Sequence, residues 1–246
     1  MQGLVAIVTG SSRGLGRAIA KEYARQMAKV VVTARPHSPT GLAGTIRQTA
    51  QDIQQEGGEA LPVPCDLSDE EQVKAMVQQV MERYGQIDVL VNNAGIMIPS
   101  EPFLEIDPER WDQLMAVNVR GPYLTCRYVL PVMMQQRRGS IINIGSRAGT
   151  SPRSGGTVYC TSKAALHMFS LCLAEEVREY NIAVNALDPG SLKSEGASVI
   201  PWARHDWHER MDPEVVSPSA VFLALQNAHT FTGRVVSRAK FGRTWP

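Results

Sequence analysis

The segment that most constrains the fold is an apolar run that leads into a glycine-rich turn near the N-terminus. Residues 4–8 read Leu-Val-Ala-Ile-Val, and residues 9–16 continue as Thr-Gly-Ser-Ser-Arg-Gly-Leu-Gly. A short apolar run of this kind predicts a buried strand. Apolar residues then recur at helical spacing over residues 15–27. Strand, glycine turn and helix in this order predict a parallel α/β sheet with a phosphate-binding site at the start of the helix.

The glycines of this turn have two physical roles. Without side chains they let the backbone approach a pyrophosphate, and they let the helix pack closely on the strand. A P-loop is the other common turn of this kind, but it requires Lys followed by Ser or Thr after its last glycine. Here Arg17 and Ala18 follow Gly16, which argues against a nucleoside-triphosphate site.

Segments with strand and helix patterns alternate along the chain from Leu4 to Val236. The 246 residues would suffice for one domain or two, but no linker, repeat or block of charge interrupts the alternation. We therefore expect one doubly wound α/β domain over residues 1–246, with a Rossmann-type parallel sheet between two layers of helices. The expected strands are residues 4–8, 30–34, 60–64, 87–91, 140–145 and 182–187.

Local signals predict several helix boundaries. One helix is expected near residues 45–56, and a Ser-Asp-Glu-Glu capping box at residues 68–71 predicts that Ser68 caps the next. Asp107 before Pro108 is typical of an N-cap followed by proline at the first helical position. The last long helix is expected to end near Tyr180.

A second pattern joins a hydroxyl, a phenol and an amine. Tyr159 lies thirteen residues after Ser146, and Lys163 follows four residues later. Positions i and i+4 share a helix face about 5 to 6 Å apart, so the amine can lie beside the phenol. Bringing a tyrosine pKa from about 10 to near 7 needs about 4 kcal/mol, which a cation about 4 Å away supplies at an effective dielectric of about 20. We therefore expect Lys163 to lower the pKa of Tyr159. A bare Tyr-x-x-x-Lys is also common on helix surfaces, so this interpretation depends on a cofactor site beside it.

The end of the second expected strand bears on cofactor choice. An Asp or Glu there would bind the ribose hydroxyl of NAD, whereas this strand ends at Arg35. Arg13 in the glycine turn and Arg35 could both bind a 2′-phosphate, because guanidinium groups pair bidentately with phosphate. The pattern favours NADP(H) over NAD(H). The alternative is that one or both arginines face solvent.

Charge and cysteine content indicate the class of partner and the compartment. The 25 basic and 24 acidic residues give a net charge of +1, so charge provides no argument for a nucleic-acid or membrane partner and a small molecule is expected. Four cysteines without Cys-x-x-Cys spacing are expected to be reduced and mostly buried. With no signal peptide ahead of the first strand and no apolar stretch of membrane-spanning length, a cytoplasmic protein is expected.

The motifs occur in the order and spacing of a known family. They are Thr9-Gly10-x-x-x-Gly14-x-Gly16, Cys65-Asp66-Leu67, Asn92-Asn93-Ala94-Gly95, Asn118, Ser146, Tyr159, Lys163 and Pro189-Gly190. Over nearly its whole length, the chain resembles the short-chain dehydrogenases and reductases, in the branch built from one domain of about 250 residues.

The resemblance implies hydride transfer between NADP(H) and a carbonyl or alcohol substrate. Tyr159 would be the general acid and base, and Ser146 would donate a hydrogen bond to the substrate oxygen. Lys163 would hold the nicotinamide ribose, and Asn118 would hold a water of the proton relay. The residues implied in cofactor binding are Gly10, Ser12, Arg13, Gly14, Leu15, Gly16, Arg35, Asp66, Leu67, Asn93, Ala94, Gly95, Tyr159, Lys163, Pro189, Gly190, Leu192 and Ser194. Relatives usually have threonine where Ser194 stands, and its hydroxyl could still bond the nicotinamide amide. The resemblance also implies a homodimer or homotetramer and no metal.

Substrate identity stays open. By resemblance, residues 191–211 cover the substrate. Ile96, Met97, Ile98, Trp202 and Trp207 could form an apolar wall for a hydrophobic ketone, whereas Arg147 and Arg153 could select an anionic substrate. His205 and His208 have metal-ligand spacing but no third ligand nearby, and we expect no metal there.

Two other functions compete with this reading. One is a nucleotide-binding sensor or scaffold without turnover, which the complete set of catalytic residues argues against. The other is an epimerase or dehydratase of the longer related branch, against which the lack of a further C-terminal domain argues. The loop at residues 36–41 could wrap the adenosine end of a cofactor. The tail at residues 237–246 departs from the family pattern and could pack across a subunit interface or on its own core.

Overall fold

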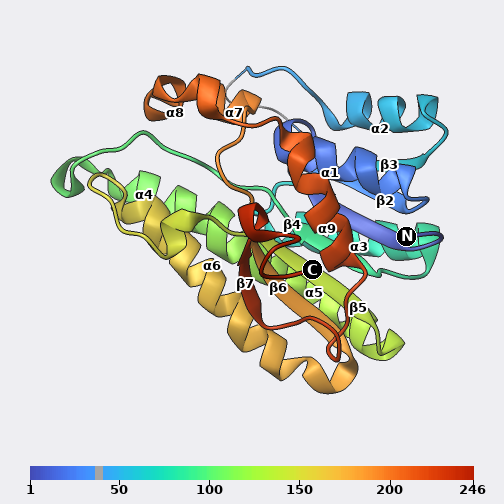
Figure 1. Ribbon diagram of the computed structural model, residues 1–246. Helices are drawn as coiled ribbons and strands as arrows, with labels where there is room; N and C mark the ends of the chain where they lie inside the picture. The colour runs from blue at the N-terminus through green and yellow to red at the C-terminus, as the bar shows by residue number, and fades with distance from the viewer. Residues whose placement is uncertain (37–40) are drawn as a thin grey trace.

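The computed structural model describes residues 1–36 and 41–246. Within these residues, seven parallel strands form one sheet in the order β3-β2-β1-β4-β5-β6-β7. Figure 1 shows helices on both sides of this sheet, which confirms the expected doubly wound, three-layer α/β/α fold. The strands are β1 (Val5–Thr9), β2 (Lys29–Ala34), β3 (Glu59–Pro64), β4 (Val89–Asn92), β5 (Gly139–Ile144), β6 (Ile182–Asp188) and β7 (Arg234–Ser237).

Alternating side chains of β1 anchor the two helical layers. Ala6 and Val8 pack with α1, α2 and α9 on one face, and Val5 and Ile7 pack with α3, α5 and α6 on the other. Successive residues of a strand point to opposite faces, so a strand covered on both sides is apolar throughout. The helices are α1 (Gly14–Arg25), α2 (Ile46–Gln55), α3 (Glu70–Tyr84), α4 (Pro108–Met115), α5 (Gly121–Gln136), α6 (Thr157–Glu176), α7 (Glu195–Ser198), α8 (Pro201–His205) and α9 (Ser217–Ala224).

The fourth strand begins two residues later than expected. Ile87 is fully buried, but its backbone N–H donates to Gln136 Oε1 at 3.1 Å and its carbonyl accepts from Gln136 Nε2 at 2.8 Å. A side chain of α5 therefore takes the hydrogen bonds that a neighbouring strand would otherwise provide, and β4 starts at Val89.

The expected cap at Ser68 is wrong. Asp69 is the N-cap of α3, and its carboxylate accepts from the backbone N–H groups of Glu71 and Gln72. The Ser68 hydroxyl instead donates to Asp66 Oδ1 at 2.7 Å. Either residue is a good cap, and the turn that Asp66 forms with Ser68 leaves the capping position to Asp69.

The other two boundary predictions have different outcomes. The Asp107 side chain caps α4 by accepting from Glu109 N at 2.9 Å, as expected. The last long helix, α6, ends at Glu176 and not near Tyr180, because a 3₁₀ turn over Arg178–Tyr180 follows it.

The C-terminal tail packs on its own core. Trp245 is 7% exposed, stacks on Phe231 at 5.7 Å between ring centroids and lies 4.8 Å from Phe241. Its indole N–H donates to Ser237 O at 2.9 Å. Figure 1 places the C-terminus beside α9, whose Phe222 joins this aromatic cluster. Of the two alternatives for the tail, packing on the chain's own core is the one observed.

The four cysteines are free thiols. Cys65 and Cys126 are buried and Cys160 is half-buried, but Cys172 is exposed, because it lies on the solvent side of α6. The expectation of mostly buried thiols is therefore wrong for Cys172. Among the described helices, none combines the length and apolar character needed to span a membrane.

Candidate active site

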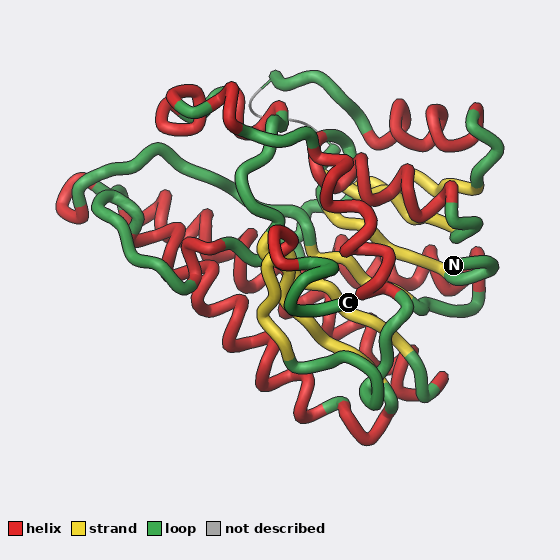
Figure 2. Tube along the Cα trace, viewed as in Figure 1, coloured by secondary structure: helices red, strands yellow, loops and turns green. Residues whose placement is uncertain are grey.

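The glycine turn and the loop after β4 form one surface. Asn93 Nδ2 donates to Thr9 O at 2.8 Å and to Gly10 O at 3.2 Å. A Cβ added to Gly16 would lie 2.4 Å from Asn93 Nδ2, and Gly10 has a left-handed backbone with φ of +65°. The glycines are therefore required by close packing, as expected. Long loops leave the sheet where β4 and β6 end (Figure 2).

The start of α1 offers backbone donors to this surface. Arg13 occupies the N-cap position in an extended conformation, and its side chain does not cap the helix. Its guanidinium donates instead to the Gly44 carbonyl oxygen at 3.2 Å. The first backbone N–H groups of a helix have no partner inside it, and together with the helix dipole they favour an anion. This geometry fits the pyrophosphate of a dinucleotide.

The loop after β6 brings its predicted residues to the same place. A Cβ added to Gly14 would lie 3.0 Å from Ser194 Cβ. The Ser194 hydroxyl caps α7 by accepting from Ala197 N at 3.2 Å, which leaves its own proton for another acceptor. Pro189 and Leu192 of the same loop are buried. Residues predicted from two distant motifs therefore meet at Gly14.

The residues expected at the adenosine end follow the neighbouring strands β2 and β3. Arg35 is exposed directly after β2, and Leu67 is buried after β3. The Asp66 carboxylate accepts from Ser68 N at 2.9 Å and so holds the turn before α3. Of the loop expected to wrap the adenosine end, residues 37–40 lie outside the described part of the chain.

Tyr159 and Ser146 meet where β5 ends and α6 begins. The Ser146 hydroxyl accepts from Ala148 N at 3.1 Å, and the Ser146 side chain lies close enough to the Tyr159 phenol to lower its pKa. Burial raises the pKa of Tyr159 to about 12, while the Ser146 hydrogen bond and then the Arg153 charge act in the opposite direction. The phenol is therefore protonated at neutral pH.

Lys163 lies one helical turn from Tyr159 but points elsewhere. Its Nζ donates to Ile144 O at 2.7 Å and lies 5.8 Å from the centroid of the Tyr159 ring. Burial lowers the pKa of Lys163 to about 8, against an opposing effect of Asp188. The expectation that Lys163 brings the pKa of Tyr159 near 7 is therefore wrong here, because burial raises that pKa and the opposing effects come from Ser146 and Arg153.

Asn118 lies in a π-helical turn, Ala116–Arg120, between α4 and α5. Its Oδ1 accepts from Ile96 N at 2.7 Å, and its Nδ2 donates to Ile96 O and to Ser162 Oγ. A Cβ added to Gly95 would lie 3.3 Å from Asn118 Oδ1 and 3.8 Å from Lys163 Nζ. Gly95 of the loop after β4 is therefore close to both the Asn118 side chain and the Lys163 amine.

Sequence reasoning missed His167, which follows Lys163 by one turn of α6. The imidazole is 6% exposed, and its Nε2 accepts from Ser146 N at 3.4 Å. Added Cβ atoms at Gly145 and Gly149 would lie 2.4 and 2.6 Å from the ring. Burial and then the Lys163 charge lower the pKa of His167, and Asp188 opposes them. Its spacing of four from Lys163 was a signal that could have found it.

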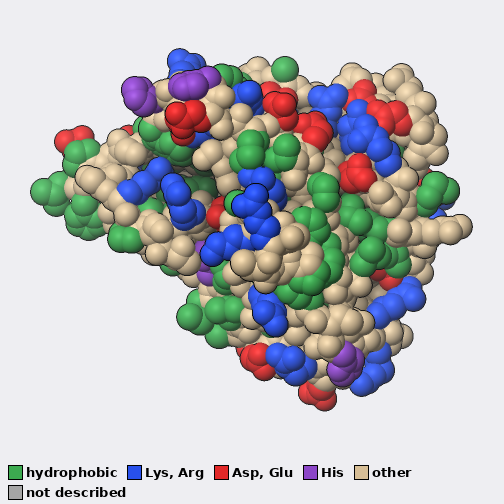
Figure 3. Space-filling model, viewed as in Figure 1, with side chains coloured by type: hydrophobic (Ala, Val, Ile, Leu, Met, Phe, Trp, Pro, Cys, Tyr) green, Lys and Arg blue, Asp and Glu red, His purple; other side chains and the backbone are tan. Residues whose placement is uncertain are grey.

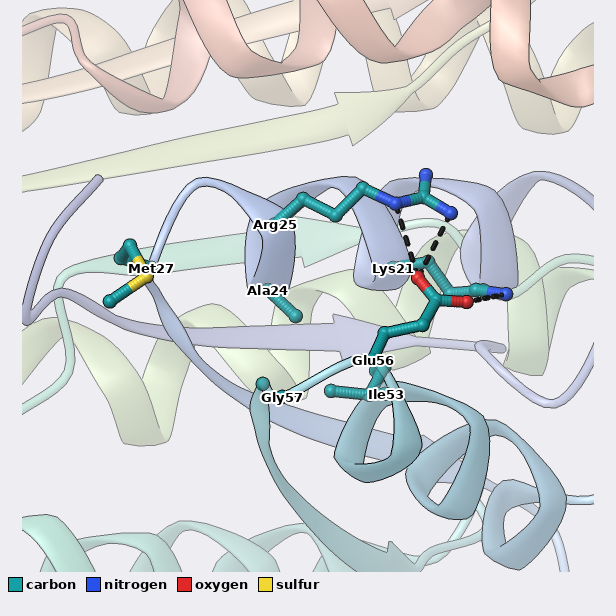
Figure 4. Close-up of a pocket in the computed structure, with 8 residues that line it drawn as sticks. Lys21, Ala24, Arg25, Met27, Ile53, Glu56 and Gly57 are labelled. Atoms are coloured by element: carbon teal, nitrogen blue, oxygen red, sulfur yellow. Dashed lines mark hydrogen bonds and ion pairs between the residues drawn. The ribbon is translucent and has the colours of Figure 1, made fainter.

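Two hollows flank α1 and differ in character. The one in Figure 4, of about 80 Å³, lies near the carboxyl end of α1, where Glu56 pairs with Lys21 at 2.6 Å and Arg25 at 3.0 Å. The other, of about 550 Å³, lies at the opposite end of α1 and is lined by Gly14 and Ser194. Only the larger hollow adjoins the predicted cofactor residues.

A family model described as short chain dehydrogenase matches residues 4–202. The chain belongs to the short-chain dehydrogenase family. The chain is 34% identical over 238 residues to an uncharacterized oxidoreductase of Staphylococcus saprophyticus. The alignment covers 97% of this chain and 98% of the relative.

Two solved structures extend the comparison. A metagenomic short-chain oxidoreductase in complex with NADP is 35% identical, with a TM-score of 0.80 and coverage of 96% of this dehydrogenase and 97% of that chain. The 3-ketoacyl-(acyl-carrier-protein) reductase of Brucella melitensis complexed with NADH is 30% identical, with a TM-score of 0.84 and coverage of 96% of each chain. Membership of the family makes this chain an oxidoreductase with a Rossmann-type fold.

Proposed function

We propose that this dehydrogenase interconverts a carbonyl compound and an alcohol with NADP(H), and that residues 1–246 form one dinucleotide-binding and catalytic domain. One juxtaposition supports the proposal: the Ser146 side chain acts on the Tyr159 phenol at the carboxyl end of the sheet, and the loop that packs on Gly10 through Ala94 carries Gly95 beside Lys163 Nζ. Residues 191–211 would cover the substrate.

The dinucleotide would be held by the residues described above. The uncapped start of α1 and the loop around Asn93 would receive the pyrophosphate, and Lys163 would bind the nicotinamide ribose. When bound, the reduced nicotinamide supplies a hydride, with its two electrons, to the carbonyl carbon. The shape of this dinucleotide site depends on its glycines, because a side chain at Gly16 would collide with Asn93.

The chain's own residues would complete the reaction by supplying a proton. The Tyr159 phenol holds its proton at neutral pH, since burial raises its pKa to about 12, and it would give that proton to the carbonyl oxygen as the C=O bond becomes CH–OH. Ser146 would donate a hydrogen bond to the same oxygen and stabilise its developing charge. Lys163 would stabilise the resulting phenolate, and Asn118 would support return of a proton.

Replacing Tyr159 tests the role of the phenol. We expect Tyr159→Phe to lower kcat/KM about 10² to 10⁴-fold on any accepted ketone, because a positioned general acid contributes about that much. The matched control is Tyr123→Phe, which removes a hydroxyl from an exposed tyrosine on α5. Circular dichroism would verify folding of both variants. Wild-type turnover by Tyr159→Phe would contradict the proposal, and tight NADPH binding without turnover of any carbonyl would favour the sensor or scaffold.

The preference for NADP(H) is tested separately. Arg13 and Arg35 support it, as does the NADP complex of the metagenomic relative, whereas the Brucella relative was crystallised with NADH. We expect Arg35→Gln and Arg13→Gln each to lower kcat/KM for NADPH by about tenfold, since each removes a charge-assisted contact to the 2′-phosphate. Activity with NADH serves as the internal control. Equal use of both cofactors by the wild type would refute the preference.

A further inference from the structure

Arg153 lies across the start of α6 and faces Tyr159. A Cβ added to Gly156 would lie 2.7 Å from Arg153 Cγ and 3.1 Å from its Nε, so the arginine stem rests on the glycine backbone. The guanidinium carbon is 6.0 Å from the centroid of the Tyr159 ring. This cation also counteracts the effect of burial on the pKa of Tyr159. The guanidinium therefore lies close to the group that would bind the substrate oxygen.

Trp202 of α8 holds this guanidinium from the other side. Arg153 Cζ is 4.5 Å from the centroid of the Trp202 ring, and the indole N–H donates to Ile98 O at 3.3 Å. Three segments thus meet around Arg153: the loop after β4, the start of α6 and the covering segment. Figure 3 shows a hollow below α7 and α8 with Lys and Arg side chains along its rim.

A second arginine on Trp202 provides an internal comparison. Arg210 lies 5.5 Å from the same ring, but it is 6% exposed and donates to Asp206 Oδ1 at 2.8 Å and to Ala203 O at 2.9 Å. Its charge is therefore matched within the protein. For Arg153, no described carboxylate lies within ion-pair distance. Arg153 is also exposed, so the charge beside Tyr159 is accessible to solvent and to a bound anion.

We propose that Arg153 binds the carboxylate of the substrate, so that the enzyme acts on oxo acids whose carboxylate lies only a few bonds from the carbonyl. The inference rests on the proposed function, because it places the carbonyl oxygen at Tyr159 and Ser146. A guanidinium matches a carboxylate with two parallel hydrogen bonds, and the Trp202 ring 4.5 Å away restricts where the guanidinium can lie. Met97 and Trp202 pack together against Ala197, Ile200 and Ala203, so the side chains around Arg153 are largely apolar.

The test compares each oxo acid with its own methyl ester. Reduction of a series of 2-oxo, 3-oxo and 4-oxo acids and their esters by NADPH gives the ratio of kcat/KM for acid to ester. The wild type is expected to prefer at least one acid by about tenfold or more, and Arg153→Gln to reduce that ratio by about tenfold or more, mainly through KM for the acid. Arg153→Lys keeps the charge without the fork and is expected to restore part of the preference.

The matched control is Arg83→Gln. Arg83 is exposed and stacks on Tyr84 at 5.5 Å, far from α6, and this substitution is expected to leave the ratio unchanged. Quenching of tryptophan fluorescence by the oxo acid, with NADP⁺ present, measures binding without turnover and is expected to weaken in Arg153→Gln. The inference is overturned if Arg153→Gln leaves the acid-to-ester ratio unchanged, or if the wild type prefers the esters. In either case the proposed function still holds if the enzyme reduces esters and this activity depends on Tyr159. If the wild type reduces neither acids nor esters, the proposed function fails, and the inference fails with it.

Discussion

Two polar clusters lie along α6, and they use their hydrogen-bonding groups in opposite ways. In the first, Asn143 joins Asn92 and Ser170 by hydrogen bonds of 2.9 and 2.8 Å, and Thr125 donates to Asn92 at 2.7 Å. All four side chains are buried, and each bonds to another. This cluster, the core network, satisfies itself, which is how buried polar groups stabilise a fold.

The second cluster is the candidate site of Ser146, Tyr159, Lys163 and His167. Here burial shifts the pKa of three ionisable groups away from their ordinary values, and the buried His167 Nδ1 has no hydrogen-bond partner among the described residues. Such groups lower stability in exchange for reactivity. The comparison teaches that polarity and burial do not by themselves mark a site: the candidate site differs from the core network in its shifted pKa values and its unpartnered imidazole nitrogen.

Lys163 should give the largest effect, on activity and stability in opposite directions. Because burial lowers its pKa from 10.5 to about 8, the unfolded chain binds the proton more tightly, and charging the folded amine costs stability at every pH below about 8. We expect Lys163→Met to lower kcat/KM about 10² to 10⁴-fold and to raise the free energy of unfolding by about 1 to 3 kcal/mol at pH 7. Steady-state kinetics and urea unfolding of one preparation measure both.

The same pKa shift predicts a pH dependence that serves as the control. Between pH 8 and 10.5 the unfolded chain binds more protons at Lys163, so the wild type should gain stability with rising pH relative to Lys163→Met. If Lys163→Met is both inactive and less stable than the wild type at pH 7, Lys163 stabilises the fold as the core network does. The contrast between the two clusters would then fail for Lys163.

Asn143 should give the next largest effect, on stability alone. Asn143→Ala leaves the Asn92 amide without its oxygen acceptor, and we expect it to lower the free energy of unfolding by about 2 kcal/mol. Thr125→Val, which removes one hydroxyl at nearly constant volume, should destabilise by a smaller amount. In both variants kcat at saturating cofactor should stay within about threefold of wild type, because neither residue is bonded to the candidate site. A hundredfold loss of kcat with unchanged unfolding would show that the network is part of the site.

Much of the framework behind this comparison was predictable from local pattern. The apolar run at β1 and the glycines after it predicted the parallel sheet, and strand ends predicted where Ser146 and Asn93 would lie. Parallel strands end at one edge of the sheet, so knowing the strand order suffices to gather these residues. The family resemblance then assigned roles that spacing alone left open.

What could not be predicted depends on contacts between distant segments. The start of β4 is set by Gln136, which lies 49 positions from Ile87. The charge balance at Tyr159 depends on Ser146, Arg153 and Asp188 together, and the sequence places only their order on the chain. Burial, which decides the direction of the pKa shift, exists only in the folded protein. Even His167, which has the right spacing, could have been a core residue until its contact with Ser146 was known.

His167 gives the smallest expected effect and the finest test. Its pKa is lowered by burial, so as pH falls below about 6.5 the unfolded chain takes up a proton that the folded imidazole resists. The wild type should therefore lose stability on the acid side relative to His167→Leu, which has nothing to protonate there. Because Nε2 accepts from Ser146 N, we also expect a small loss of kcat in His167→Leu and partial recovery in His167→Gln, whose amide oxygen can accept that N–H. If the free energy of unfolding falls equally with decreasing pH in the wild type and in His167→Leu, protonating the imidazole costs no stability. His167 would then belong with the self-satisfied groups of the core network.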